Sequence, residues 1–157
     1  MKKKLYKVKK SNIHRRGLYA SKDIKSGTKI IQYKGKIISV KETERNPKFD
    51  NDKSIYLFNL TKKYDLDGDF KYNTARLINH SCDPNCEVDG IGLKLWIYAI
   101  KDIKKGEELS YDYGFSYDED YKNFPCRCQS KNCAGYIVRS ESRWRIKKNK
   151  KPKQINI

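Results

Sequence analysis

The cysteines constrain the fold of this chain most strongly. Cys126, Cys128 and Cys133 lie within one short stretch, and Cys82 and Cys86 lie well upstream of it. Structural zinc takes four ligands in a tetrahedron and binds thiolates well, and Cys-x-Cys spacing suits a metal better than a disulfide. We therefore predict a zinc site with Cys82 or Cys86 as its fourth ligand, which requires two distant stretches to fold together. An odd total of five cysteines, without a secretory signal, indicates a reducing compartment.

Length and composition indicate one small, polar domain. The chain has 157 residues, of which 37% are hydrophobic and 35% charged, so we expect a soluble domain with a thin core. No apolar run approaches the roughly 20 residues of a membrane helix. We expect an intracellular protein without membrane contact. It would lie in the nucleus or on chromatin if eukaryotic, and be cytoplasmic or host-directed if bacterial or viral.

The formal net charge of +17 is concentrated at the two ends of the chain. Residues 2–16 contain eight basic side chains, and residues 143–153 contain seven. Such ends attract phosphate backbones or acidic proteins, but a basic tail can also be merely solubilising. The charge therefore leaves nucleic-acid contact through the basic ends as one of two interpretations.

Most of the chain has the alternation typical of strands. Residues 29–38 read as two short strands around Gly35, residues 54–60 as a half-buried strand, and residues 93–100 as the strongest strand. The sequence therefore predicts a mainly β fold of short strands and small sheets.

Turns and helices are sparse in the prediction. Asp67-Gly68 and Asp89-Gly90 have the residue types of tight hairpin turns. Short helices are expected over residues 40–45 and 74–78. Residues 141–157 are basic and lack an apolar pattern until near their end, so we predict a mostly disordered tail.

Three motifs, in order along the chain, resemble the SET-domain protein lysine methyltransferases. They are Asn-His-Ser-Cys-Asp-Pro-Asn-Cys at residues 79–86, Gly-Glu-Glu-Leu-Ser-Tyr-Asp-Tyr at 106–113, and Cys-x-Cys-x4-Cys at 126–133. The resemblance spans roughly residues 7–136, and it includes further matches at residues 13–19, 33–35 and 56–58.

The resemblance implies a SET-domain fold with a pseudoknot, in which the Asn-His segment lies under the strand that leads to Tyr-Asp-Tyr. It implies a SET domain over residues 5–116, a post-SET zinc-binding segment over 117–140, and the basic tail beyond. It also implies a Zn²⁺ ion, with Cys86 as a spare thiol. The implied zinc ligands are Cys82, Cys126, Cys128 and Cys133.

The cofactor implied by the resemblance is S-adenosylmethionine. Its methionine end carries a carboxylate, which suits the cations and backbone amides of the N-terminal loop, and amide and imidazole groups can hydrogen-bond to it. The implied cofactor-binding residues are His14, Arg16, Gly17, Tyr56, Asn79, His80 and Arg127.

The implied catalytic residues are Tyr113, Tyr56 and Tyr111. A lysine amine with a pKa of roughly 10.4 has to lose its proton before it attacks a methyl group. Without an obvious carboxylate base, we expect burial beside a cationic sulfonium to lower that pKa, and the tyrosine hydroxyls to orient the amine. A hydroxyl at Tyr111 favours mono-methylation. The competing interpretation is that these tyrosines are ordinary packed strand aromatics.

Two residues depart from the family pattern. Arg15 stands where the N-terminal loop often has its first glycine, and Tyr72 stands where a small residue is usual. Because glycine tolerates turns that other residues avoid, we expect the change at Arg15 to affect cofactor affinity more than the fold.

The sequence thus favours an enzyme, an S-adenosylmethionine-dependent protein-lysine N-methyltransferase. Its charge of +17 would repel a free basic peptide at long range, so we expect a histone or another nucleic-acid-bound protein as the substrate. The alternatives are a catalytically inactive SET-like zinc-binding interaction module and a basic nucleic-acid-binding zinc protein.

Overall fold

The chain is built mainly from short strands, as its alternating sequence predicts. The computed structural model describes residues 2–50 and 55–146. The strands are β1 (Tyr6–Lys10), β2 (Arg16–Ala20), β3 (Lys29–Tyr33), β4 (Lys36–Ser39), β5 (Leu57–Asn59), β6 (Tyr64–Asp67), β7 (Asn79–His80), β8 (Cys86–Ile91), β9 (Lys94–Ala99) and β10 (Ser110–Tyr111). The helices are α1 (Val40–Arg45) and the 3-10 helices Pro47–Phe49, Thr74–Leu77, Tyr121–Asn123 and Ser140–Arg145.

The strands form small separate sheets around one core. Antiparallel sheets have the orders β1-β2, β3-β9-β8 and β4-β6-β5. Fully buried side chains such as Leu18, Ile97 and Leu109 join these sheets into one apolar cluster. The predicted mainly β class is confirmed, and so are the strands around Gly35 and the helix over residues 40–45.

One parallel pair brings together two of the recognised motifs. In it Asn79 lies beside Ser110 and His80 beside Tyr111, across β7 and β10. The Asn-His segment therefore lies directly against the start of the Tyr-Asp-Tyr element, as the resemblance implied. This contact joins residues about thirty positions apart and fixes the centre of the site.

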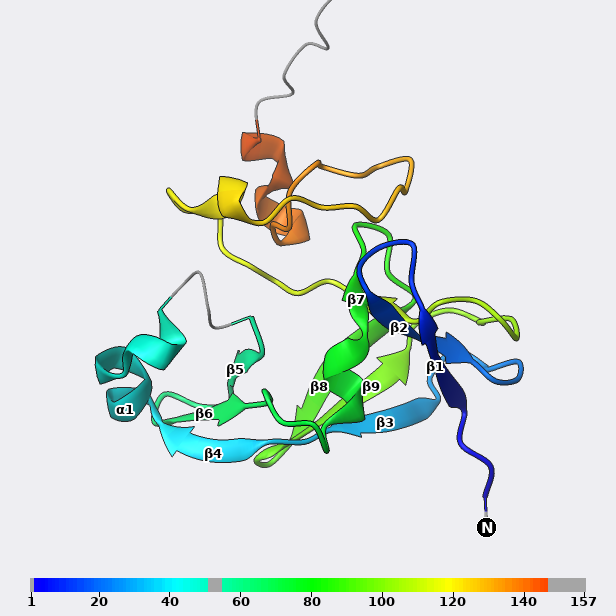
Figure 1. Ribbon diagram of the computed structural model, residues 1–157, viewed down its shortest axis with the longest axis horizontal. Coiled ribbons are helices and arrows are strands. Elements are labelled where there is room, and N and C mark those ends of the chain that lie inside the picture. Colours follow the sequence, from blue (N-terminus) through cyan, green and yellow to red (C-terminus); the bar gives the residue numbers. More distant parts are fainter. Residues whose placement is uncertain (1, 51–54, 147–157) are drawn as a thin grey trace, which may run out of the picture.

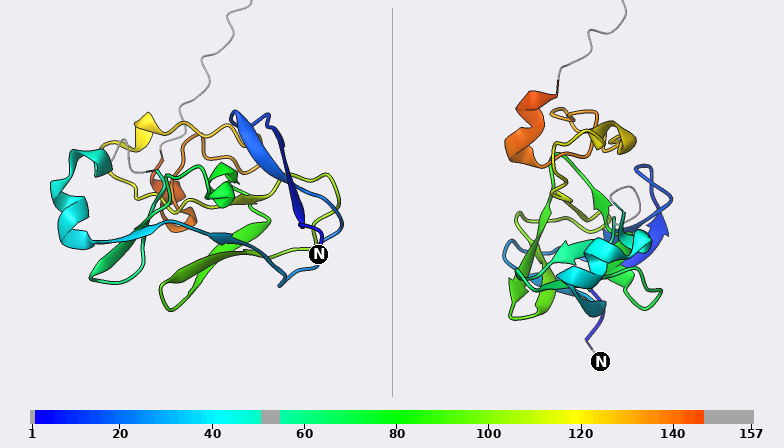
Figure 2. Two further views of the ribbon diagram at one scale, coloured as in Figure 1. Left: turned by 60° about the horizontal axis from the view of Figure 1, so that its bottom comes forward. Right: turned by 90° about the vertical axis from the view of Figure 1, so that its left-hand side faces the viewer.

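The C-terminal segment lies as a separate layer on one side of the sheets. Figure 1 and the right-hand view of Figure 2 show the C-terminal segment, yellow to red, above the strands. This layer contains no strand pair longer than the isolated bridge between Pro125 and Tyr136, within the residues that the structure describes.

Both predicted hairpin turns are wrong. Asp67 ends β6, and Gly68 leads on to the next loop, where a Cβ atom would collide with the ring of Tyr33. Gly90 lies inside β8, and the turn follows at Gly92, which has a φ of 62°. At residue 68 the glycine is required by a close approach of an aromatic ring, which sequence-local turn chemistry does not reveal.

Two further predictions are corrected. The strand expected over residues 54–60 is limited to β5, and residue 54 lies outside the described part. The tail expected to be mostly disordered over residues 141–157 begins with an ordered segment, formed by the 3-10 helix Ser140–Arg145 and the buried Ile146. Its first residues are ordered because they pack on the domain, and residues 147–157 lie outside the described residues. No helix among the described residues has the length and apolarity needed to cross a bilayer.

Candidate active site

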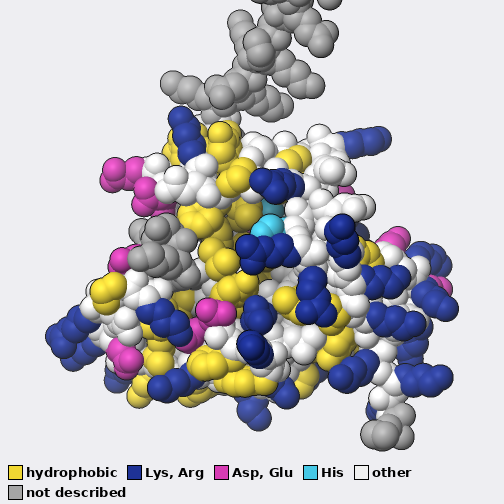
Figure 3. All heavy atoms as spheres, viewed as in Figure 1, with side chains coloured by type: hydrophobic (Ala, Val, Ile, Leu, Met, Phe, Trp, Pro, Cys, Tyr) yellow, Lys and Arg dark blue, Asp and Glu magenta, His cyan; other side chains and the backbone are white. Residues whose placement is uncertain are grey.

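A cavity of about 510 Å³ opens between the strand region and the C-terminal layer. Its volume is within the usual range for small-molecule and cofactor sites. Figure 3 shows a histidine side chain at this face, with hydrophobic side chains on its left and Lys or Arg side chains above and below it. Of the residues predicted from sequence, those that line the cavity are His14, Arg16, Tyr56, Asn79, His80, Tyr113, Cys126 and Arg127.

Asn79 holds the N-terminal loop against the cavity. Its Nδ2 lies 3.1 Å from the Oγ of Ser11, 3.2 Å from the carbonyl oxygen of His14 and 3.1 Å from that of Arg16. It also lies 2.9 Å from Oε1 of Glu108. An amide nitrogen carries only two protons, so these acceptors share them, and Asn79 supports the loop as well as facing the cavity.

Glu108 is a site residue that the sequence analysis missed. Its carboxylate accepts hydrogen bonds from the Ser11 hydroxyl at 2.7 Å and from the Tyr19 hydroxyl at 3.0 Å, besides the Asn79 amide. A Cβ atom on Gly17 would collide with this carboxylate. Gly17 thus makes room for Glu108 rather than lining the cavity. The Gly-Glu-Glu-Leu motif was the available signal, but the partners of Glu108 lie far away in sequence.

Arg15 adopts a left-handed backbone conformation, with a φ of 43°. This conformation costs a residue with a Cβ atom roughly 1–2 kcal/mol of conformational free energy, whereas glycine adopts it without that cost. The departure at Arg15 therefore falls at a position where glycine would relieve strain in the cavity loop. Tyr72, the other departure, is 59% exposed and stacks on Phe70 with 5.1 Å between ring centroids, so its bulk is accommodated at the surface.

The three predicted catalytic tyrosines lie in different environments. The Tyr113 hydroxyl donates to the carbonyl oxygen of Ile78 at 2.7 Å, which leaves its oxygen as an acceptor. Tyr56 lines the cavity, with the Arg76 guanidinium 5.8 Å from its ring centroid. Tyr111 is buried behind them, 4.9 Å from the Tyr113 ring. Burial raises the pKa of Tyr111 and Tyr113, so both stay neutral and neither serves as a base near neutral pH.

His80 connects the tyrosine pair to the sulfur cluster. Its Nδ1 accepts the backbone N–H of Tyr113 at 3.1 Å, which assigns the ring proton to Nε2. Nε2 lies 3.7 Å from the sulfur of Cys82. His80 is 3% exposed, so packing fixes its ring between the cavity and the cysteines.

Four cysteines gather as the sequence predicted. The sulfurs of Cys82, Cys126, Cys128 and Cys133 all lie within 4.8 Å of one another, and those of Cys82 and Cys126 are 3.8 Å apart. Zinc–sulfur bonds of about 2.3 Å in a tetrahedron require sulfurs about 3.8 Å apart, so the set fits zinc. A hydrogen bond from the Cys126 thiol, supported by His80 and Arg143, holds the pKa of Cys82 well below its usual value.

Cys86 is not part of this cluster, so of the two upstream cysteines only Cys82 lies with the three downstream ones. Its sulfur lies 3.4 Å from Oδ1 of Asn85. Burial raises the pKa of the Cys86 thiol to about 12, so it stays protonated and is a packed core side chain.

An arginine clasp holds the C-terminal layer on the strand region. Arg143, in the 3-10 helix Ser140–Arg145, donates to the carbonyl oxygen of Cys82 at 2.9 Å and to Oδ2 of Asp112 at 2.8 Å. It also donates to the carbonyl oxygen of Val138 within its own layer at 2.9 Å. The sequence analysis placed this arginine in a disordered tail, because nothing in the local pattern reveals partners that are distant in the chain.

Comparisons with known proteins identify the family of this chain. The SET domain family matches residues 15–114, and the chain belongs to this family. It is 40% identical over 136 residues to a protein of Drosophila virilis named histone-lysine N-methyltransferase trithorax, with 83% of this chain and 4% of that protein covered.

Two further relatives carry similar names. Human histone-lysine N-methyltransferase 2D is 36% identical over 134 residues, covering 82% of this chain and 2% of that protein. Histone-lysine N-methyltransferase set1 of Dictyostelium discoideum is 42% identical over 138 residues, covering 83% of this chain and 9% of that protein. The chain therefore spans less than a tenth of the length of these relatives.

Proposed function

We propose that the chain is an S-adenosylmethionine-dependent protein-lysine N-methyltransferase. The observation that carries this proposal is the convergence of Tyr56, Asn79, His80 and Tyr113 on one cavity that is closed by a cysteine-bearing wall. The names of the relatives support the same activity. The cofactor would supply a methyl group on a cationic sulfonium.

The loop cations and the facing wall suit this cofactor. Arg15 and Arg16 line the cavity together with His14, and their guanidinium groups can hold a carboxylate through charge-assisted hydrogen bonds. Phe124 and Ile137 from the C-terminal layer supply apolar surface at the same cavity. A carboxylate and a flat apolar group would thus each find a complementary part of the site.

The incoming lysine has to be neutral when it attacks. The apolar wall and the neighbouring guanidinium groups of Arg76 and Arg127 both disfavour an ammonium, so its proton would leave to water before transfer. The Tyr113 oxygen, whose own proton is held by the Ile78 carbonyl, accepts one N–H of the amine. That hydrogen bond directs the nitrogen lone pair along the line of displacement.

We also propose that Tyr111 favours mono-methyl-lysine as the product. Its ring packs on those of Tyr113 and Phe58, with centroid distances of 4.9 and 6.2 Å, and its hydroxyl would occupy volume that a second methyl group needs. Replacing Tyr111 by Phe should shift the products toward di- and trimethyl-lysine, as read by mass spectrometry. Mainly trimethyl-lysine from the unchanged protein would contradict the proposal.

The substrate class that fits best is a histone, or another nucleic-acid-bound protein, on chromatin. The relatives' names specify histone lysines, and a net charge of +17 disfavours a free basic tail unless nucleic acid is present. We also propose nucleic-acid contact through the basic ends.

Incubation with radiolabelled cofactor and a panel of nucleosomes, free histones and cell lysate tests the activity. Label on histones in nucleosomes supports it, and no label on any substrate would contradict it.

A further inference from the structure

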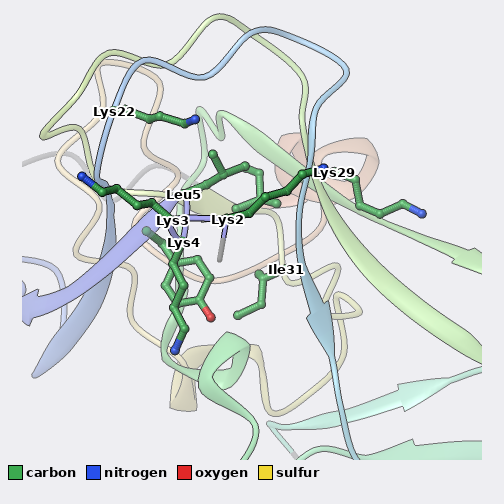
Figure 4. A pocket seen from close by; sticks show the side chains of 9 residues that line it. Lys2, Lys3, Lys4, Leu5, Lys22, Lys29 and Ile31 are labelled. Atoms are coloured by element: carbon green, nitrogen blue, oxygen red, sulfur yellow. The ribbon is translucent and has the colours of Figure 1, made fainter.

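A second hollow lies on the strand region, away from the cofactor cavity. It is a groove of about 630 Å³ between the first residues of the chain, Lys22, and the beginning of β3. Figure 4 shows lysine side chains extending around it from both sides, with Leu5 and Ile31 between them. We call it the lysine groove, and its lining residues are Lys2, Lys3, Lys4, Leu5, Tyr6, Lys22, Lys29, Ile30 and Ile31.

The lysine groove carries uncompensated positive charge. Five of its nine lining residues are lysines, and none is acidic. Among the residues that the structure describes, none of the five lysines forms an ion pair. Asp23 follows Lys22 directly, but its carboxylate lies 3.7 Å from Lys104 and accepts the backbone N–H of Lys105 at 2.9 Å. The nearest acid in sequence therefore contacts Lys104 and Lys105 and not a lysine of the groove.

Aromatic rings rather than carboxylates position two of these lysines. The ammonium of Lys29 lies 4.5 Å from the ring centroid of Trp96, and that of Lys4 lies 5.9 Å from the ring of Tyr6. Cation–π contact holds a charge in place without cancelling it. The groove thus presents ammonium groups that remain available to an external anion.

We propose that the lysine groove binds the phosphate backbone of a DNA duplex. A polyanion fits better than a single small anion because further exposed lysines, Lys7, Lys9 and Lys10, follow the groove residues on strand β1. Lysine ammoniums act as point charges that neutralise successive phosphates. The groove has no arginine, so it offers point charges and no bidentate contact to either a phosphate or a carboxylate. A duplex is the better fit than an acidic protein because its phosphates form a regular row of charges, about one per 1.7 Å of helix axis, that several lysines can neutralise together.

The β1-β2 hairpin connects this groove to the cofactor cavity. Tyr6, at the start of β1, lines the groove, and residues 13–16, beyond its other end, line the cavity. Five strand residues span roughly 16 Å, so DNA in the groove would pass close to the cavity. A basic histone tail beside that DNA would reach the site despite the like charge. This consequence for substrate choice rests on the proposed function, whereas the DNA binding itself does not.

Two variants of equal charge loss test the proposal in the full chain. One replaces Lys3, Lys4, Lys22 and Lys29 by Gln, and the other replaces Lys36, Lys41, Lys62 and Lys63, which belong to the β4, α1 and β5-β6 end of the molecule (Figure 1). Fluorescence anisotropy with a short labelled duplex is measured between about 50 and 200 mM salt. The groove variant should lose roughly 3 to 4 from the slope of log affinity against log salt, about 0.9 per phosphate contact. The control should keep the slope of the unchanged protein.

Several outcomes would overturn the assignment. Equal loss in both variants would mean that binding follows net charge and not the groove. Polyglutamate serves as a model of an acidic protein. If the groove variant loses polyglutamate binding but keeps duplex binding, the groove is assigned to an acidic protein. Thermal melting checks that the variants fold, and if the Lys29 change disturbs the contact with Trp96, the triple variant without it should still lose roughly 2 to 3 from the slope.

A methylation assay separates the two proposals. The groove variant should methylate a free histone-tail peptide as fast as the unchanged protein, and lose rate on nucleosomes by about tenfold or more. Equal nucleosome rates for both would contradict a role of the groove in substrate choice. If the unchanged protein methylates neither substrate, the proposed function fails while the duplex-binding result stands.

Discussion

The strand region and the C-terminal layer are stabilised by different means. The strand region has a continuous apolar cluster, with Leu18, Ile97 and Leu109 fully buried. In the described part of the layer after residue 116, only Val138 and Ile146 are buried hydrophobic residues. That layer relies on the sulfur cluster and on Arg143. Because the cavity lies between the two, one wall is fixed by the core and the other depends on the cysteines and the clasp.

The largest expected effect comes from removing one sulfur of the cluster. Cys126→Ser leaves three thiols, so metal binding and the C-terminal wall should be lost together. Affinity for S-adenosylmethionine should fall by at least about 100-fold, while the strand region keeps its circular dichroism. Cys86→Ser is the matched control because its sulfur lies outside the cluster. If both variants had equal metal content and equal affinity for S-adenosylmethionine, the C-terminal layer would not depend on the sulfur cluster.

The next effect concerns the rigid wall of the cavity. Tyr113→Phe removes the oxygen that accepts the lysine N–H, so methyl transfer should slow by roughly 100-fold. Cofactor affinity should stay nearly constant, because the phenyl ring is retained. Tyr117→Phe serves as the control, since its ring packs on Tyr121 with 4.7 Å between centroids. Full activity of Tyr113→Phe, measured with labelled cofactor, would exclude the assigned role.

A smaller effect should follow at the support of the N-terminal loop. Glu108→Gln replaces a carboxylate that accepts hydrogen bonds from Ser11, Tyr19 and Asn79. Bonds to a charged acceptor are the stronger ones, so cofactor affinity should weaken by about tenfold. Glu107→Gln changes the neighbouring exposed carboxylate and should have no effect. Calorimetric titration of both variants compares them, and equal affinities would show that Glu108 does not support the site.

The smallest effect is the pH dependence of stability, which becomes visible only far from neutral pH. We expect the strand region to lose stability at high pH and the C-terminal layer to lose it at low pH. Burial raises the pKa of Tyr33, Tyr111 and Tyr113 above that of a free tyrosine, near 10. The contribution of these three tyrosines to the free energy of unfolding is fully present below pH 10. It is lost as the pH rises toward their folded pKa, because the unfolded chain releases protons first. The free energy of unfolding should therefore fall above pH 10, by about 1.4 kcal/mol per pH unit for each such tyrosine.

In acid, protonation of the thiolates should release zinc and loosen only the C-terminal layer. Urea unfolding between pH 8 and 11 and a zinc-sensitive dye at falling pH measure the two responses. Simultaneous loss of both regions at one pH would contradict their independence.

Sequence patterns predicted those features that depend on neighbours in the chain. Alternation gave the strand β9, and close spacing identified the downstream cysteines. Features that depend on tertiary contacts were missed, such as the ring of Tyr33 against Gly68 and the three partners of Glu108. Arg143 was assigned to a disordered tail because its partners, Cys82 and Asp112, are distant in the chain.

The dependence of the cofactor site on the cysteine-held wall can be tested by one titration series. Binding of S-adenosylmethionine is measured by calorimetry in zinc-loaded protein, after chelation, and after zinc is restored. We predict binding in the first state, loss of binding in the second with the strand region still folded, and recovery in the third. Equal affinity with and without zinc would show that the cavity does not need this wall, and would contradict the account.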